Sequence, residues 1–469
     1  MSWQLIIEQN SMNTSYMDSP KRENILFWNK SKDAYISLNS IEDNYEVSGW
    51  RYYILILYML MIYWTAMLRT SDSNINLILD ELYGMSQTSH TVLNKLPEIL
   101  FLPGAILSTY LFNKFSLKTG LGIGMMILSL GAWMNILATM HYSCLFLGQS
   151  LCALANPTII LSWSLVAVKW FEDSKRVLAT SIAVSITYSW FIKGFGIPNF
   201  VVNIEEDEQS LQGQLALIFG VEASVTVFIT ILTFVSFKSE PLLPPSAAAE
   251  VNRDDDILGT YRALIWNREF MLLTWSQVWY YAMIIGIDDN FVTIAKLYKY
   301  SDSQILNCEL INVNFGVLGS IILGIFLHFT KLYKTANAGI GLASLIWVIW
   351  LIFTFDRGYT SLSILYGFLG FMQYPLITIC YIYSSEVAYP LKETTVLGFI
   401  RCLSVVIGYL VCLVSWIMLR YLNSKHTADI FIIVMCVLTF FGIIFALLMK
   451  PIKSSAIKHD QLGKFYRKW

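Results

Sequence analysis

Charged residues are scarce in this chain. Only 14% of its 469 residues are Asp, Glu, Lys or Arg, whereas soluble domains have about 25%. Hydrophobic residues make up 56%, and the mean hydropathy is +0.55. The formal net charge of −1 provides no basic field that would attract nucleic acid. This composition favours a membrane protein and argues against one that binds nucleic acid.

Motifs of enzymes and of metal sites are also missing from the sequence. It contains no GxGxxG loop, no Walker loop and no HExxH. The seven cysteines show no CxxC spacing and the five histidines do not cluster, so no disulfide framework, haem-ligand pair or metal site is indicated. We therefore predict that the protein is not an enzyme and has no cofactor and no metal.

Long apolar runs dominate the rest of the chain. A membrane-spanning helix needs about 20 mainly apolar residues, and twelve runs meet that need. They lie at residues 52–68, 92–112, 120–140, 143–168, 177–202, 213–237, 270–295, 305–327, 337–355, 359–384, 395–419 and 430–449. Residues 1–50 lack the apolar core of a signal peptide, so we expect the first spanning helix to direct membrane insertion.

Two stretches of the sequence recur at one spacing. Residues 64–74 (WTAMLRTSDSN) match 280–290 (YYAMIIGIDDN), and 111–119 (LFNKFSLKT) match 327–335 (LHFTKLYKT), each at an offset of 216 residues. Two parallel repeats of about six helices are the plan of the major-facilitator transporters. The predicted fold is an all-α membrane protein with the major-facilitator fold, its twelve transmembrane helices in two six-helix halves at 51–237 and 269–449. A cytoplasmic linker, 238–268, and tails at 1–50 and 450–469 complete the organisation.

Basic residues concentrate in the connections on one side of the predicted membrane. Cytoplasmic loops carry such an excess of Lys and Arg, so both termini are expected in the cytoplasm. The residues that set this orientation are Lys114, Lys118, Lys169, Lys175, Arg176, Lys238, Arg253, Arg262, Arg268, Lys331, Lys334 and Lys392. We predict a multi-pass protein of the plasma membrane that is a monomer, with the lipid bilayer and a small-molecule substrate as its partners.

Six short patches recur in a known family of transporters. They are residues 131–133 (GAW), 147–152 (LGQSLC), 170–171 (WF), 238–241 (KSEP), 316–321 (GVLGSI) and 386–390 (EVAYP). Together they resemble the feline leukaemia virus subgroup C receptor family of major facilitators. The resemblance covers about residues 51–451. It implies a transporter of choline and ethanolamine, with haem export also attributed to the family.

The sequence departs from that family where the substrate is expected to bind. Aligned on residues 82–84 (LYG), Arg69 stands where the family has a tryptophan of an aromatic box for a quaternary ammonium. Tyr188 and Val405 stand near two family glutamines, and Arg401 replaces a family asparagine. Ring faces attract a cation, whereas an arginine repels it. A misalignment of one turn would instead return Trp64 to the box.

Three cations within or near apolar runs support a changed substrate. Arg69, Lys193 and Arg401 fall in helices expected to border a central cavity. Charged side chains at bilayer depth usually face the bundle interior or a cavity, where these three would suit an organic anion. The alternative is that each extends its long side chain to a membrane interface.

Other polar and aromatic residues complete the predicted site. Carboxylates can be counter-ions or proton carriers, or solvated at helix ends, and aromatic residues can line a cavity or simply pack. Prolines that kink helices and basic residues of the loop after the second span are candidates for gating. The further substrate-binding candidates are Trp64, Asp72, Tyr188, Tyr280, Tyr281, Asp288, Gln373 and Tyr374, and the gating candidates are Pro157, Pro375, Lys114 and Lys118.

The predicted function is transport of a small organic solute by alternating access. The family resemblance favours choline, ethanolamine or haem, whereas the three cations favour an organic anion. The alternative is a membrane receptor or scaffold that has lost transport, because the family glutamines are missing and Asn113 replaces the aspartate with which facilitators form a latch in this loop.

Overall fold

A computed structural model describes residues 47–68, 73–84, 87–188, 208–245, 249, 256–389, 391–422 and 424–451. These residues belong to one compact unit, and their regular structure is entirely helical. The first helix group comprises α3 (Trp50–Met67), α4 (Ser73–Tyr83), α5 (Gln87–Ile99), α6 (Phe101–Lys114), α7 (Leu117–Ile136), η1 (Leu137–Thr139), α8 (Tyr142–Ile160), α9 (Trp163–Trp170), α10 (Asp173–Thr187) and α12 (Glu208–Ser236). After α14 (Ile257–Trp266), the second group comprises α15 (Arg268–Leu297), α16 (Asp302–Thr330), α17 (Tyr333–Ile352), η3 (Phe355–Arg357), α18 (Tyr359–Val387), α19 (Glu393–Leu422) and α20 (Lys425–Leu448).

Within the described ranges, nine helical segments are long and apolar enough to cross a membrane. They are Leu117–Thr139, Tyr142–Trp170, Gln209–Ser236, Arg268–Leu297, Asp302–Thr330, Tyr333–Ile352, Tyr359–Val387, Glu393–Leu419 and Lys425–Leu448. Each coincides with one of the twelve predicted spans. The other three predicted spans fall on α3, on α5 with α6, and on α10, whose predicted continuation to residue 202 lies outside the described residues.

Polar caps mark where several long helices begin. Ser301 and Gln304 form a capping box at the start of α16, in which each side chain binds the other residue's backbone N–H. The Asn267 side chain accepts a hydrogen bond from the Phe270 N–H and caps α15. These caps satisfy N–H groups that an apolar helix leaves unpaired at its first turn.

Glycines allow the helices of the second group to approach closely. A side chain at Gly316 of α16 would collide with the Tyr374 ring of α18, and one at Gly370 of α18 would collide with the Asn312 carbonyl of α16. Because apolar helices gain little by leaving lipid, close contact through small residues is what selects their partners. The pairs α15–α19, α15–α20 and α17–α20 also pack together, as do α7–α8 and α7–α12 in the first group.

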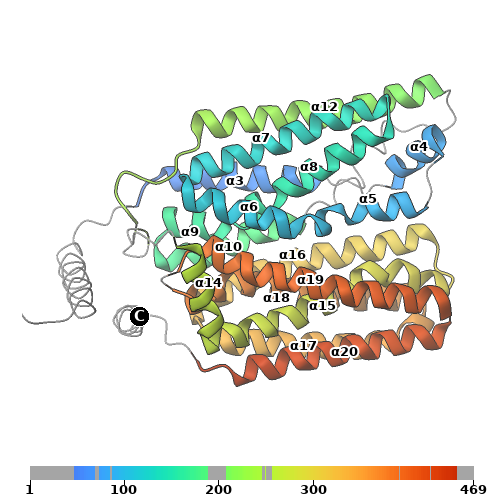
Figure 1. Ribbon diagram of the computed structural model, residues 1–469. Helices are drawn as coiled ribbons and strands as arrows, with labels where there is room; N and C mark the ends of the chain where they lie inside the picture. The colour runs from blue at the N-terminus through green and yellow to red at the C-terminus, as the bar shows by residue number, and fades with distance from the viewer. Residues whose placement is uncertain are drawn as a thin grey trace, which may run out of the picture. The chain divides into compact units, whose positions relative to one another are not determined.

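The two helix groups contact each other along several elements (Figure 1). Helix α10 packs against α16, α6 against α19, and α9 against α18. The Trp163 and Tyr381 rings stack with 5.1 Å between their centroids, and the Ser164 hydroxyl donates to the Tyr381 carbonyl over 3.2 Å. These contacts place side chains from both groups around the centre of the unit.

Candidate functional site

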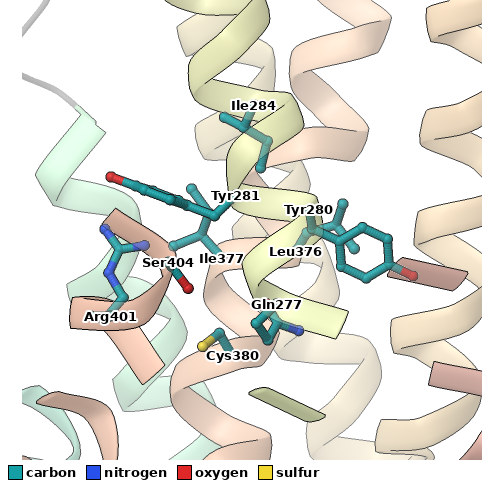
Figure 2. Close-up of a pocket in the computed structure, with 9 residues that line it drawn as sticks. All are labelled: Gln277, Tyr280, Tyr281, Ile284, Leu376, Ile377, Cys380, Arg401 and Ser404. Atoms are coloured by element: carbon teal, nitrogen blue, oxygen red, sulfur yellow. The ribbon is translucent and has the colours of Figure 1, made fainter. Parts of the chain in front are cut away.

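A small pocket lies between α15, α18 and α19. It has room for about one water molecule, so the helices around it are closely packed. The residues that line it are Gln277, Tyr280, Tyr281, Ile284, Leu376, Ile377, Cys380, Arg401 and Ser404 (Figure 2). Arg401 is the one ionisable cation among these nine lining residues.

Arg401 stacks on an aromatic ring in this pocket. Its Cζ lies 4.1 Å from the centroid of the Tyr281 ring and 6.0 Å from that of Phe101, which belongs to α6. Figure 2 shows the guanidinium beside the Tyr281 ring. Its Nε is buried and has no hydrogen-bond partner within the described residues, and no carboxylate there forms an ion pair with it. Cation–π contact therefore supports the guanidinium without neutralising its charge.

Tyr280 and Tyr281 point to different sides of α15 (Figure 2). The Tyr280 ring lies beside Gly341 of α17 and Gly442 of α20, and its hydroxyl donates to the Asn337 carbonyl over 3.4 Å. The Gln277 amide donates to the Asn337 side-chain oxygen over 3.0 Å. Tyr280 borders the pocket but mainly holds α15 against α17 and α20.

Asp288 forms a second polar centre on α15. Its carboxylate accepts hydrogen bonds from the hydroxyls of Tyr366, at 3.5 Å, and Tyr374, at 3.4 Å, both on α18. The Tyr188 ring, at the end of α10, lies 4.5 Å from the Tyr374 ring. Two tyrosines thus hold this carboxylate, and no cation of the described chain pairs with it.

An ion pair joins the two helix groups one residue further along α15. The Lys95 amine, on α5, lies 2.6 Å from an Asp289 carboxylate oxygen, with both side chains about 30% exposed. The Cys412 thiol of α19 donates to the same oxygen over 3.1 Å, and the Lys95 amine lies 5.3 Å from the Tyr409 ring centroid. This cluster ties α5 to α15 and α19.

Two other predicted substrate residues lie in packed surroundings. The Trp64 indole N–H donates to the Thr226 hydroxyl over 2.8 Å, which turns the ring toward α12. Gln373 is fully buried, and its amide donates to the Met283 sulfur over 3.2 Å. Arg69, Asp72 and Lys193 lie outside the described residues, so their predicted roles stay predictions.

The two candidate gating prolines occupy similar environments. A side chain at Gly104 of α6 would meet the Pro157 ring of α8 at 2.8 Å, and one at Gly319 of α16 would meet the Pro375 ring of α18 at 3.1 Å. Helix α8 ends at Ile160, whereas α18 continues unbroken past its proline. Both prolines are thus contact points for a glycine of a neighbouring helix.

The candidate gating lysines lie at the start and end of neighbouring helices. The Lys114 amine donates to the Tyr110 hydroxyl over 3.0 Å. This hydrogen bond raises the pKa of Lys114, because the hydroxyl stabilises the charged amine. The backbone N–H of Lys118 donates to the Ser239 hydroxyl over 3.1 Å, which holds the start of α7 to the linker.

Sequence reasoning missed most of the pocket. Gln277, Ile284, Cys380 and Ser404 line it but were not candidates. Helical spacing held a usable signal, since Gln277, Tyr281, Ile284 and Asp288 recur at intervals of four, three and four residues along one face of α15. The pairing of Lys95 with Asp289 could not be found in this way, because the two residues lie on different helices that are far apart in the sequence.

Comparison with solved structures identifies the fold. The E. coli fucose:proton symporter FucP, a major-facilitator protein, aligns with a TM-score of 0.65 and 14% identity, covering 86% of this chain and 100% of that one. A second FucP structure, in the outward conformation, gives a TM-score of 0.65 at 15% identity, covering 85% of this chain and 99% of that one. No family model matches the sequence. The chain is a multi-pass membrane protein with the fold of the major-facilitator superfamily.

Curated relatives refine this class. The choline/ethanolamine transporter FLVCR1 of Felis catus is 26% identical over 420 residues, covering 86% of this chain and 73% of the relative. The choline/ethanolamine transporter FLVCR2 of Homo sapiens is 26% identical over 349 residues, covering 71% of this chain and 65% of the relative. These relatives confirm the resemblance found in the sequence: within the superfamily, the chain is similar to the feline leukaemia virus subgroup C receptor family.

Proposed function

We propose that this protein transports a small organic solute by alternating access, and that Arg401 binds an anionic group of that solute. The observation that carries the proposal is the Arg401 guanidinium, which faces the pocket with a buried, unpartnered Nε. A guanidinium binds carboxylates and phosphates through paired N–H donors. A charge kept inside a membrane protein without a counter-ion costs free energy. Such charges usually have a function, which explains why they are retained.

Contacts between the helix groups support a rocking motion of two halves, 51–237 and 269–449. The Lys95–Asp289 pair closes the end at which α5 begins and α15 ends. The stack of Trp163 on Tyr381 lies toward the other end, where α9 and α18 finish. In alternating access these contacts would break in turn around a midplane site. We place both termini in the cytoplasm on the basis of loop charge. The plasma membrane as the location stays a prediction.

A second candidate is transport of choline or ethanolamine, as the relatives' names state for those proteins. The observation that favours it is the Asp288 centre, where the carboxylate accepts from Tyr366 and Tyr374 and the Tyr188 ring packs on the Tyr374 ring. A carboxylate and ring faces both attract an ammonium group. Arg401 opposes this reading, because its own charge already occupies the Tyr281 ring face.

Binding to the purified full-length protein separates the two candidates. A ligand that binds only the folded state raises the melting temperature, so we would screen organic carboxylates, organic phosphates, choline and ethanolamine. We expect an anion to stabilise the parent and Arg357→Gln, which changes an exposed arginine, but not Arg401→Gln. Stabilisation by choline or ethanolamine alone would overturn the anion assignment. A ligand that binds but is not taken up by vesicles containing the protein would instead identify a receptor without transport.

A further inference from the structure

Two opposite charges lie along one side of α15. Arg401 reaches this helix at Tyr281, where its Cζ is 4.1 Å from the ring centroid, and Asp288 belongs to α15 itself. Tyr281 and Asp288 are seven residues apart, so they share a helix face and lie about 10 Å apart along the axis. Arg401 and Asp288 are both partly exposed, whereas Ile284 and Ile287 are buried. The two charged side chains are therefore less tightly enclosed than the apolar residues between them.

Both charges lie where the two helix groups meet. The Arg401 Cζ is 6.0 Å from the ring centroid of Phe101, on α6 of the first group. Asp288 accepts from the Tyr374 hydroxyl, and the Tyr374 ring lies 4.5 Å from the ring of Tyr188, which ends α10 of the first group. The substrate of a secondary transporter binds at the interface of its two repeats. Arg401 and Asp288 thus have the location that substrate-binding groups require.

Apolar side chains separate the two charges. Ile284 follows Tyr281 by three residues and precedes Asp288 by four. It lines the pocket at Arg401 together with Ile377 of α18 (Figure 2). Binding sites for small molecules typically combine such apolar walls with a few polar groups that fix the ligand's orientation. A solute that contacts both charged groups would place a hydrocarbon segment against these isoleucines.

We infer that the solute is a zwitterion, with an acidic group bound by Arg401, an ammonium group bound by Asp288, and an apolar spacer of several carbons between them. This inference rests on the proposed function, since it adds a second contact to the anion site at Arg401. The hydroxyls of Tyr366 and Tyr374 hold the Asp288 carboxylate in position for the ammonium. A spacing of about 10 Å along α15 favours a chain of this kind over an α-amino acid, whose two charged groups share one carbon.

Three probes of similar size separate the contributions of the two charges. ε-Aminocaproate carries both groups, caproate only the acidic group and hexylamine only the ammonium. The concentration dependence of the melting temperature of the purified full-length protein gives each Kd, at one ionic strength. We expect the parent to bind ε-aminocaproate about 10-fold tighter than caproate, because a second hydrogen bond to a charged group is gained.

The possible outcomes distinguish this inference from the proposed function. Equal affinities for ε-aminocaproate and caproate would overturn the zwitterion and leave the anion site at Arg401 standing. Binding of hexylamine alone would overturn the anion site as well. Binding of none of the three probes would overturn the zwitterion, whereas the wider screen of anions would still test the proposed function.

Removing one charge at a time assigns the two groups. Asp288→Asn should bind caproate as the parent does but lose the preference for ε-aminocaproate, and its caproate binding also shows that the variant is folded. Arg401→Gln should lose caproate binding. The matched control Asp302→Asn, which changes a carboxylate that is 85% exposed, should keep both affinities. A preference for ε-aminocaproate that survives in Asp288→Asn would exclude Asp288 as the ammonium site and overturn the inference.

Chain length tests the separation of the two charges. Glycine, γ-aminobutyrate and ε-aminocaproate carry the same two groups at increasing distance from each other. We expect the affinity of the parent to rise along this series. The rise should be smaller in Asp288→Asn, where only the apolar contact grows with chain length. Tightest binding of glycine by the parent would overturn the arrangement of two separate charged centres.

Discussion

The two polar centres on α15 differ in how their charges are compensated. At Tyr281 a guanidinium lies over an aromatic ring, and at Asp288 a carboxylate accepts from two tyrosines. Among the residues that the structure describes, no carboxylate pairs with the first and no cation pairs with the second. Tyr281 and Asp288 are seven residues apart, about 10 Å along the helix. Neither of these two charges neutralises the other. Under the proposed function, each of them binds a charged group of the solute.

The largest expected effect is the loss of anion binding when Arg401 is replaced. Arg401→Gln should weaken binding of the stabilising anion about 10- to 100-fold, because a hydrogen bond to a charged group contributes about 1.5–3 kcal/mol. Isothermal titration or the concentration dependence of the melting temperature would measure the change. Arg401→Lys should restore only part of the affinity, because a lysine keeps the charge but not the paired donors. Full affinity in Arg401→Gln would remove Arg401 from the site.

Adjacent carboxylates provide the next contrast. Asp289→Asn should destabilise the protein by about 1 kcal/mol or less, since it leaves Lys95 without its partner in a partly exposed pair. Asp288→Asn should not destabilise it, because the amide oxygen still accepts from the two tyrosines. Denaturation of both variants in the same detergent measures the difference. Equal losses of stability would show that Asp288 has a cation partner.

A double-mutant cycle sharpens the same contrast. Lys95→Met and Asp289→Asn should be coupled by about 0.5–1 kcal/mol, because the two side chains are in direct contact. Lys95→Met and Asp288→Asn should be nearly additive. The melting temperatures of the parent, the three single variants and the two double variants supply both cycles. Stronger coupling to Asp288 than to Asp289 would mean that the ion pair is exchanged between the two aspartates.

The sequence predicts the spanning helices well because run length and apolarity determine what can cross a membrane. It predicts the site less well because helix faces and partners depend on packing. Tyr280 and Tyr281 were equal candidates, yet a rotation of about 100° per residue directs one toward α17 and the other toward Arg401. Whether Arg401 reaches the interface or the pocket likewise depends on how α19 is turned against α15. Trp64 faces α12 for the same reason.

The smallest expected effect concerns the ring beneath the cation. Tyr281→Leu should weaken anion binding about 2- to 5-fold, since a cation–π contact contributes about 0.5–1 kcal/mol and here positions the guanidinium rather than touching the ligand. Tyr281→Phe keeps the ring and should change the affinity by less. A loss in Tyr281→Phe as large as in Tyr281→Leu would assign the contribution to the hydroxyl. Both variants keep Arg401, so both should still bind the anion in preference to choline. A preference for choline in Tyr281→Leu would show that the ring, and not the arginine, decides which charge the site accepts.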